Sequence, residues 1–140
     1  MKKIIFLLLI LPFISLSLSC GRSNTAEWQS DPDARIHVYF FHTSEICPAC
    51  TAVEENTKAV LEANFKALTA DGTIDYQSFD LGMKENRAVA EKYQISYTSL
   101  LIIRSDGTLT DFTNNAMNYA NTSPDKFMEM LKTEIGKNLE

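Results

Sequence analysis

The apolar and polar positions of the chain alternate between strand-like and helix-like segments from residue 35 onward. Residues 35–41 are rich in β-branched and aromatic residues with little alternation, which is typical of a strand buried on both faces. Residues 48–68 then carry apolar side chains at spacings that lie on one side of a helix. These apolar positions are Val53, Val60, Leu61, Phe65 and Leu68. The sequence therefore predicts a central strand followed by a helix.

The middle of the chain repeats this alternation. Residues 73–80 alternate like a half-buried strand, and 84–93 form a short helical pattern. The apolar run 100–103 and the segment 108–113 flank a turn signal that ends in Asp106-Gly107. We expect these last two segments to be strands that pair as a hairpin.

The C-terminal third predicts a loop and then a helix. Residues 114–122 contain four asparagines and are expected to be a loop, after which Ser123 caps a helix over 124–137. The apolar face of that helix is Phe127, Met130, Leu131 and Ile135. The element order begins with strand, helix, strand, so the first two strands are expected to pair in parallel through a right-handed crossover. The fold class is α/β, a layered sandwich with a central mixed sheet flanked by helices.

The N-terminus reads as an export signal. Lys2 and Lys3 precede an apolar stretch, and a serine-rich segment follows, so residues 1–19 are expected to be a signal peptide. The apolar stretch is shorter than the roughly 20 residues of a membrane-spanning helix and is broken by Pro12. Export places the remaining cysteines outside the reducing cytosol, on the periplasmic side of a bacterial membrane.

Cys20 stands directly after this signal. Ser17-Leu18-Ser19-Cys20 resembles the lipobox of bacterial lipoproteins, although Ser17 occupies the usual leucine position, and it predicts that Cys20 is lipidated. Residues 20–33 would then be a tether to the membrane, and 34–140 the folded domain. Trp28 on this tether is expected to be an exposed aromatic, and docking on the domain or contact with a partner is the alternative. The small residues at 17 and 19 also satisfy ordinary signal cleavage, so a soluble periplasmic product is the alternative.

Charge excludes one class of partner. Without Lys2 and Lys3 the chain has 11 basic and 18 acidic residues, a formal charge of −7. No basic cluster interleaved with aromatic residues is present, so we expect no nucleic acid partner.

Cys47-Pro48-Ala49-Cys50 carries the candidate chemistry. Cys47 is expected at the helix N-cap and Pro48 at the first helical position, where unpaired amides and the helix dipole favour an anionic sulfur by roughly 0.3–1 kcal/mol. Because the thiolate is the nucleophile in disulfide exchange, Cys47 is predicted to attack. Cys50, three residues on, can close the ring as the resolving thiol.

Two other uses of this motif stay open. A CxxC pair is half of a zinc site, and the other Cys or His residues are Cys20, His37 and His42. The dithiol could hold a soft ion such as copper(I), zinc or trivalent arsenic, with His42 at the mouth of the site as a further ligand or as support for the thiolate. The third interpretation is that the domain is an accessory subunit of a redox system, in which the disulfide is only structural. His37, inside the first strand, is expected to be a packed or edge residue.

Over residues 34–140 the chain resembles the thioredoxin superfamily. The resemblance rests on 36–41, the CPAC motif, 79–81, and the passage from Ala90 to Ile103 before Asp106-Gly107. It implies a thioredoxin-like three-layer sandwich and a thiol–disulfide oxidoreductase that exchanges electrons with protein or small-molecule thiols and disulfides. We expect a monomer.

A narrower resemblance concerns residues 39–43 and Asn114, Met117, Tyr119 and Ala120. These are similar to a small bacterial thioredoxin-like family that is labelled a nitrophenyl compound nitroreductase subunit and is associated with arsenic operons. No segment is suited to flavin or nicotinamide, and no cofactor is expected.

The sequence departs from the superfamily pattern at two places. Ser99 occupies the position of the superfamily's cis-proline, so the Thr98–Ser99 peptide is expected to be trans or strained, and Thr98 and Tyr97 are candidates for contacts with a bound peptide. Ile46 and Phe41 stand where the superfamily has a tryptophan and an acidic residue, so Cys50 lacks the usual helper for proton transfer.

Overall fold

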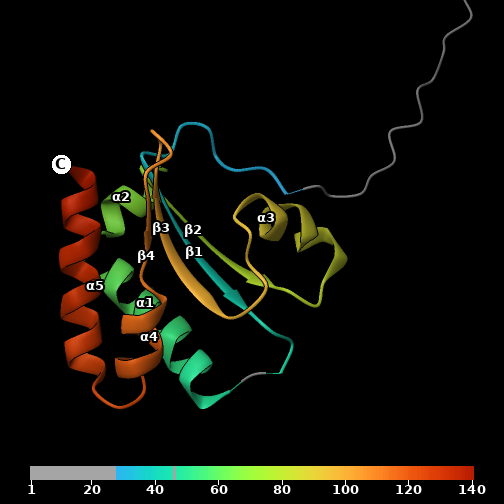
Figure 1. The fold of residues 1–140 in the computed structure, drawn as a ribbon. Helices are drawn as coiled ribbons and strands as arrows, with labels where there is room; N and C mark the ends of the chain where they lie inside the picture. Colours follow the sequence, from blue (N-terminus) through green and yellow to red (C-terminus); the bar gives the residue numbers. More distant parts are fainter. Residues whose placement is uncertain (1–27, 46) are drawn as a thin grey trace, which may run out of the picture.

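In the computed structural model, which describes residues 28–45 and 47–140, a four-stranded mixed sheet lies between two layers of helices (Figure 1). The sheet order is β2-β1-β3-β4. The strands are β1 (Ile36–His42), β2 (Ile74–Asp80), β3 (Ser99–Arg104) and β4 (Leu109–Asp111). β1 pairs with β2 in parallel and with β3 antiparallel, and β4 completes the hairpin with β3. This is the predicted thioredoxin-like sandwich with its mixed central sheet.

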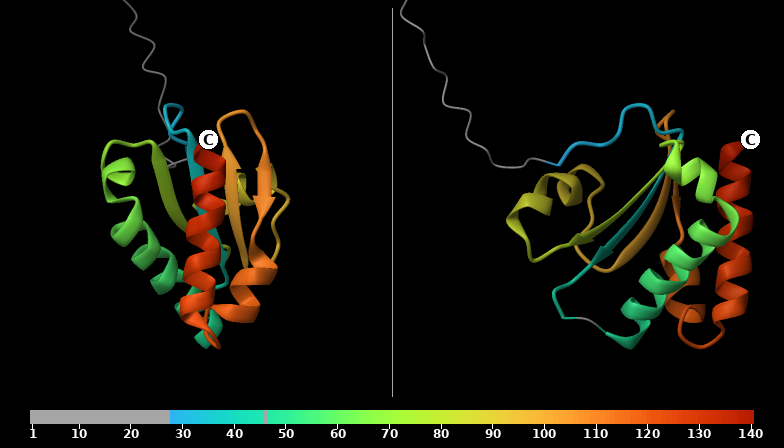
Figure 2. Two further views of the ribbon diagram at one scale, coloured as in Figure 1. Left: turned by 90° about the vertical axis from the view of Figure 1, so that its left-hand side faces the viewer. Right: turned by 180° about the vertical axis from the view of Figure 1, so that it is seen from behind.

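Helices cover both faces of this sheet, as the two views of Figure 2 show. One face carries α1, α2, α4 and α5, and the other carries the short helix η1 and α3. The helices are α1 (Pro48–Asn64), α2 (Lys66–Ala70), η1 (Lys84–Asn86), α3 (Arg87–Lys92), α4 (Thr113–Tyr119) and α5 (Pro124–Leu139). The α1 crossover between two parallel strands follows the expected βαβ connection.

The alternation of side chains along β1 divides the core in two. Val38 and Phe40 belong to the larger cluster, which faces α1, α4 and α5, while Tyr39 and Phe41 belong to a smaller cluster on the α3 face. All four side chains are at most 1% exposed. β1 is therefore the doubly buried central strand that its β-branched and aromatic residues, with little alternation, predict.

Two segments differ from the sequence-based expectation. The asparagine-rich stretch 114–122, expected to be a loop, contains most of α4. The helix expected over 48–68 is interrupted at Phe65, whose backbone leaves the helical region (φ −131°, ψ 19°), so α2 starts as a separate turn. Ser123 occupies the N-cap of α5 as expected, but its side chain makes no capping hydrogen bond.

The segment before β1, residues 28–35, lies against the domain, and we call it the N-terminal arm. The Trp28 ring makes edge-to-face contacts with Tyr39, Phe79 and Tyr93 at centroid distances of 5.9, 6.1 and 6.3 Å. Trp28 is therefore half-buried and docks on the domain, which was the alternative to the expected exposed aromatic. The predicted signal peptide, Cys20 and the first part of the predicted tether lie outside the described residues. None of the described helices is long and apolar enough to cross a membrane.

Candidate active site at Cys47 and Cys50

Cys47 lies at the junction of a loop and a helix. β1 ends at His42, and the chain returns to a helix at Pro48, with Cys47 as the N-cap in extended conformation (φ −91°, ψ 155°). Pro48 occupies the first helical position, where its missing N–H costs no hydrogen bond. The local sequence thus places Cys47 at the N-terminus of α1, as predicted.

The two sulfurs of the motif are joined as a disulfide, with Cα atoms 5.1 Å apart. The backbone N–H of Cys50 donates a hydrogen bond to Cys47 Sγ at 3.1 Å. The N–H of Thr51 donates to the Cys47 carbonyl at 3.0 Å, which begins the helical hydrogen-bond ladder. The sulfur of Cys47 therefore takes the place of the oxygen of an ordinary N-cap side chain.

The two cysteines differ in exposure. Cys50 is only 5% exposed and belongs to the larger core cluster, whereas Cys47 is half-buried and packs at its margin. Ala49 is also half-buried, and Pro48 is exposed. The first turn of α1 holds no acidic side chain that would repel a thiolate. Cys47 is thus the sulfur that a second molecule can approach.

Helix α4 flanks this site, although sequence reasoning did not foresee it. Ala116 and Ala120 are buried in the same cluster as Cys50. The Asn56 side chain on α1 donates from Nδ2 to the Ala120 carbonyl at 2.9 Å and so ties α1 to the end of α4. The signal was present: Phe112, Ala116, Tyr119 and Ala120 have the i, i+4, i+7, i+8 spacing of an amphipathic helix.

Ser99 lies at the same end of the sheet as the cysteines, because it pairs with Phe41 in the register of β1 and β3. Its side chain is buried and donates to the Tyr97 carbonyl at 3.0 Å. The Thr98–Ser99 peptide is trans, in keeping with serine at this position. Thr98 is half-buried and Tyr97 is 59% exposed, so this loop offers a surface beside the end of β1.

His42 belongs to the loop rather than to the disulfide. Its Nδ1 lies 3.0 Å from the Thr43 carbonyl, and its ring packs at 5.6 Å from that of Phe40. Among the described contacts, none joins His42 to either sulfur. Its predicted role as support for the thiolate or as a metal ligand stays a prediction.

An unforeseen pair holds the other side of the same loop. The Ser44 hydroxyl lies 2.9 and 3.1 Å from the two carboxylate oxygens of Asp80, at the end of β2. The Gly82 N–H donates to Asp80 Oδ1 at 2.8 Å. The hydrogen bonds from Gly82 and then Ser44 hold the pKa of Asp80 below its ordinary value. The neighbouring β2–η1 turn is thus joined to the loop that leads to Cys47.

For the soft-ion interpretation, the structure offers the sulfurs of Cys47 and Cys50 as ligands. In the part of the chain that the structure describes, no three His, Cys, Asp or Glu side chains gather as a metal site would require. A thiophilic ion at the reduced motif would take Cys47 and Cys50, with further ligands from solvent or from a partner.

Comparisons with known proteins give limited likeness. No family model matches the chain, and no curated protein matches it. Among solved structures, the one titled "Structure of a malarial protein" is 15% identical and has a TM-score of 0.42. The match covers 68% of this chain and 94% of the chain in that structure. The zinc-bound form of human ERp44 is 12% identical and has a TM-score of 0.48, and the match covers 68% of this chain and 28% of the ERp44 chain. Since both scores are below 0.5, the fold assignment rests on the strand order and directions described above.

Proposed function

We propose that this protein is a thiol–disulfide oxidoreductase that works through Cys47 and Cys50. The observation that carries the proposal is the hydrogen bond from the Cys50 N–H to Cys47 Sγ. A donor at this position favours the anionic sulfur over the thiol, and the dipole of α1 acts in the same direction. A merely structural disulfide would have no need of a preformed anion site at one sulfur.

The difference in burial assigns the two roles. In the reduced protein, the Cys47 thiolate attacks one sulfur of a partner disulfide, forms a mixed disulfide and releases the first partner thiolate. The Cys50 thiol then loses its proton and attacks Cys47 Sγ, which re-forms the internal disulfide and releases the second thiolate. The partner gains two electrons and the motif loses two, and the reverse sequence would oxidise a partner dithiol. Protein and small-molecule disulfides both fit this chemistry.

The cellular setting of the proposal comes from the sequence. Residues 1–19 direct export, and Cys20 carries a lipid that holds the domain on the periplasmic side of a membrane, with the soluble form as the alternative. The narrower resemblance to a nitroreductase-labelled family remains a prediction, since no family model matches.

Trapping of mixed disulfides tests the exchange itself. In a Cys50→Ser variant of the full chain, Cys47 can attack but the internal release step is blocked, so partner-linked species should accumulate on a non-reducing gel. The Cys47→Ser variant is the matched control and should trap far less, since Cys50 is buried. Equal trapping by both variants, or none by either, would contradict the proposed roles.

The reduction potential separates this function from its rivals. A reversible couple between about −120 and −270 mV in thiol buffers is expected for an exchanging dithiol. A disulfide that resists reduction below about −300 mV would indicate a structural bond. Repeating the titration with zinc, copper(I) or arsenite tests the remaining rival, because stoichiometric binding that blocks exchange would favour a soft-ion carrier.

A further inference from the structure

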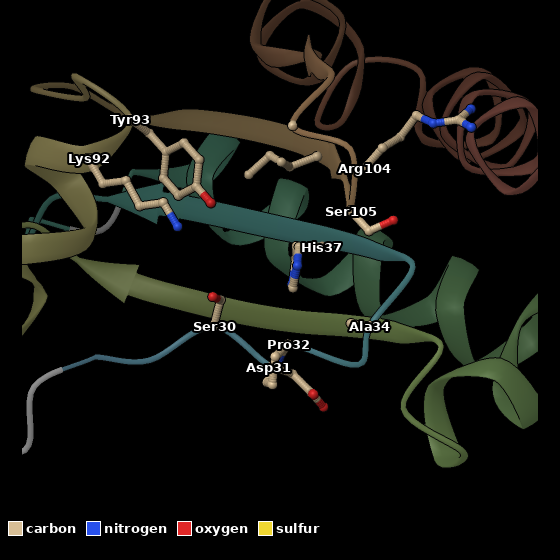
Figure 3. A pocket seen from close by; sticks show the side chains of 11 residues that line it. Ser30, Asp31, Pro32, Ala34, His37, Lys92, Tyr93, Arg104 and Ser105 are labelled. Atoms are coloured by element: carbon tan, nitrogen blue, oxygen red, sulfur yellow. The ribbon is translucent and has the colours of Figure 1, made fainter.

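A hollow on the α3 side of the sheet lies away from the disulfide. It has a volume of about 380 Å³ and opens between the N-terminal arm, the end of α3 and the turn after β3 (Figure 3). His37 lines it near the start of β1, and the strand from His37 to His42 spans about 17 Å before the cysteine loop begins. Ile103 and Tyr93 of its lining belong to the smaller core cluster, whereas Cys50 belongs to the larger one. The hollow is therefore separate from the candidate active site.

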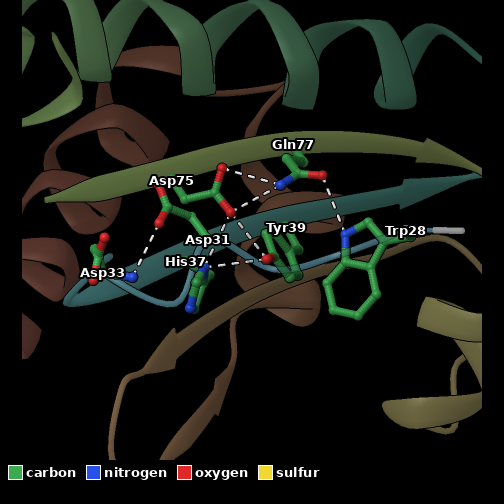
Figure 4. A network of polar contacts seen from close by, with 7 residues as sticks. All are labelled: Trp28, Asp31, Asp33, His37, Tyr39, Asp75 and Gln77. Carbon is green, nitrogen blue, oxygen red and sulfur yellow. Dashed lines mark hydrogen bonds and ion pairs between the residues drawn. The ribbon is translucent and has the colours of Figure 1, made fainter. Parts of the chain in front are cut away.

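Buried polar groups hold the His37 ring in place (Figure 4). His37 is 7% exposed, and its Nδ1 lies 3.1 Å from Asp75 Oδ2. The Tyr39 hydroxyl donates to the same Asp75 oxygen at 3.0 Å. Gln77 donates to both Asp75 oxygens at 3.1 and 2.9 Å and accepts a hydrogen bond from Trp28 Nε1 at 3.2 Å. These hydrogen bonds fix Asp75, and Asp75 in turn orients the imidazole.

The same hydrogen bonds determine which nitrogen of His37 carries the proton. Burial and then the Asp75 carboxylate raise the pKa of Tyr39, so its hydroxyl stays protonated and donates to Asp75. The Tyr39 oxygen, 3.1 Å from His37 Nδ1, is then an acceptor toward the ring, as is the Asp75 carboxylate. In the neutral ring the proton is therefore on Nδ1, and Nε2 carries a lone pair. Among the described contacts none is made by Nε2, although its side chain is more than nine-tenths buried and lines the hollow.

Lys92 supplies a hydrogen-bond donor to the same hollow. Its Nζ lies 5.0 Å from the centroid of the Trp28 ring and 5.2 Å from that of Tyr93, and it pairs with no acidic group among the described residues. Figure 3 shows the Lys92 amine turned toward His37. An acceptor without a donor at His37 and a donor without an acceptor at Lys92 thus line one hollow.

The charges around the hollow disfavour an ion of either sign. An anion would meet the lone pair of His37 Nε2, with the Asp75 carboxylate behind the ring and Asp31 at the rim. A cation could accept no hydrogen bond from the Lys92 ammonium and would be repelled by it. An uncharged group that donates one hydrogen bond and accepts another satisfies both His37 and Lys92. The apolar part of the lining is formed by Pro32, Ala34, Ile103 and the ring of Tyr93.

We propose that this hollow binds a small neutral amide with an apolar body. The amide N–H would donate to His37 Nε2 and the amide carbonyl would accept from Lys92 Nζ, with the apolar part against Ile103 and Tyr93. A cyclic amide holds its N–H and its carbonyl side by side, which suits two partners on one hollow. The volume is within the range of small-molecule sites, about 300–1,000 Å³. The site uses neither sulfur, so it is independent of the proposed exchange chemistry.

The probe is 2-piperidone, a lactam that is uncharged, soluble in water and small enough for the hollow. N-Methyl-2-piperidone is its matched control, since it keeps the carbonyl and loses the N–H. Both are titrated into the full chain in detergent at about pH 8, where an ordinary imidazole is neutral, while the nitrogen NMR resonances of the histidine rings are followed. The chain has two histidines, so His42 is an internal control. The Nε2 resonance of His37 should shift saturably with 2-piperidone, and those of His42 should not respond.

The relative affinities test the hydrogen bond and the preference for an uncharged ligand. N-Methyl-2-piperidone should bind about threefold or more weakly, the loss expected for one net hydrogen bond. Pentanoate and protonated piperidine, ions of similar size and opposite sign, should also bind more weakly than the lactam. The proposal would be overturned by the absence of a saturable shift at His37, or by an equal shift at His42. Equal binding of the two lactams, or tighter binding of either ion, would overturn it as well.

Matched variants place the binding at this site. Lys92→Met keeps an aliphatic chain over Trp28 but removes the donor, and it should raise the dissociation constant of 2-piperidone about threefold or more. Lys126→Met is the control, because Lys126 also lies over an aromatic ring, 3.7 Å from the Tyr119 centroid, but on α5. Both substitutions alter exposed side chains, so the fold should be retained. Unchanged affinity in Lys92→Met, or an equal loss in Lys126→Met, would refute the site.

Discussion

The hydroxyl of Ser44 lies 2.9 Å from Asp80 Oδ1 and 3.1 Å from Oδ2, and this joins the loop before Cys47 to the end of β2. The same end of the sheet is closed by the backbone, since the Leu81 N–H donates to the His42 carbonyl at 2.8 Å. One carboxylate thus holds two loops, one of which leads to the proposed nucleophile. Among the described contacts, none joins Asp80 to Cys47 or Cys50, so its role would be to position the loop.

Asp80→Asn should destabilise the protein at neutral pH and alter its acid denaturation. The folded pKa of Asp80 is held down by Gly82 and Ser44, so its contribution is present above the unfolded value of about 3.9 and is lost as the pH falls through the folded pKa. Thermal unfolding followed from pH 7 to pH 2 should show wild type and variant converging at acid pH. A constant gap across this range would contradict the assignment. Glu85→Gln, an exposed acid on η1, is the control.

Gly82→Ala tests the same contact from the other side. A Cβ at this position would collide with the Ser44 hydroxyl and lie 3.2 Å from Asp80 Oδ1, so the hydroxyl must rotate away from its carboxylate. We expect a lower melting temperature than wild type. In a Ser44→Ala background the collision is gone, and the added cost of Gly82→Ala should shrink. Purely additive effects of the two substitutions would show that the contact does not matter.

Reduced protein should be alkylated first at Cys47. Cys47 is half-buried with an amide donor on its sulfur, while Cys50 is 5% exposed. With limiting iodoacetamide at pH 7, peptide mapping by mass spectrometry should find Cys47 modified at least about tenfold faster than Cys50, because the thiolate is the reacting species. Peptide mapping also separates any signal from Cys20. Preferential modification of Cys50 would reverse the proposed roles.

Much of this architecture could be predicted because the core-forming pattern is strong. The pattern is clear in the β-branched and aromatic residues of β1, in the spacing of Val53, Val60 and Leu61, and in the turn at Gly107, and each predicts one local structure. Gly107 does adopt the left-handed conformation (φ 88°). Cys47 and Pro48 carry their own N-cap signal in the same way. Each of these features depends on residues close together in sequence.

The features that sequence reasoning missed depend on tertiary contacts. Asparagine is a weak helix former, so 114–122 reads as a loop, yet burial of Ala116 and the bond from Asn56 to Ala120 stabilise α4. Trp28 lies on a polar segment and is expected to be exposed, but in the fold it packs against Tyr39, Phe79 and Tyr93, which come from distant parts of the chain. The pairing of His37 with Asp75 follows from the parallel register of β1 and β2, which no local pattern fixes.

Trp28→Ala should destabilise the domain by about 1–3 kcal/mol. A fully buried tryptophan costs about 3–5 kcal/mol on truncation, and Trp28 is half-buried, with three edge-to-face contacts and a hydrogen bond to Gln77. Trp28→Phe keeps part of the ring contact but loses the N–H donor, so it should lie between wild type and Trp28→Ala. Tyr97→Ala, at a 59% exposed aromatic, is the control and should stay within about 0.5 kcal/mol. Urea unfolding measured by circular dichroism gives all four values, and a Trp28→Ala variant as stable as Tyr97→Ala would mean that the arm adds nothing to the fold.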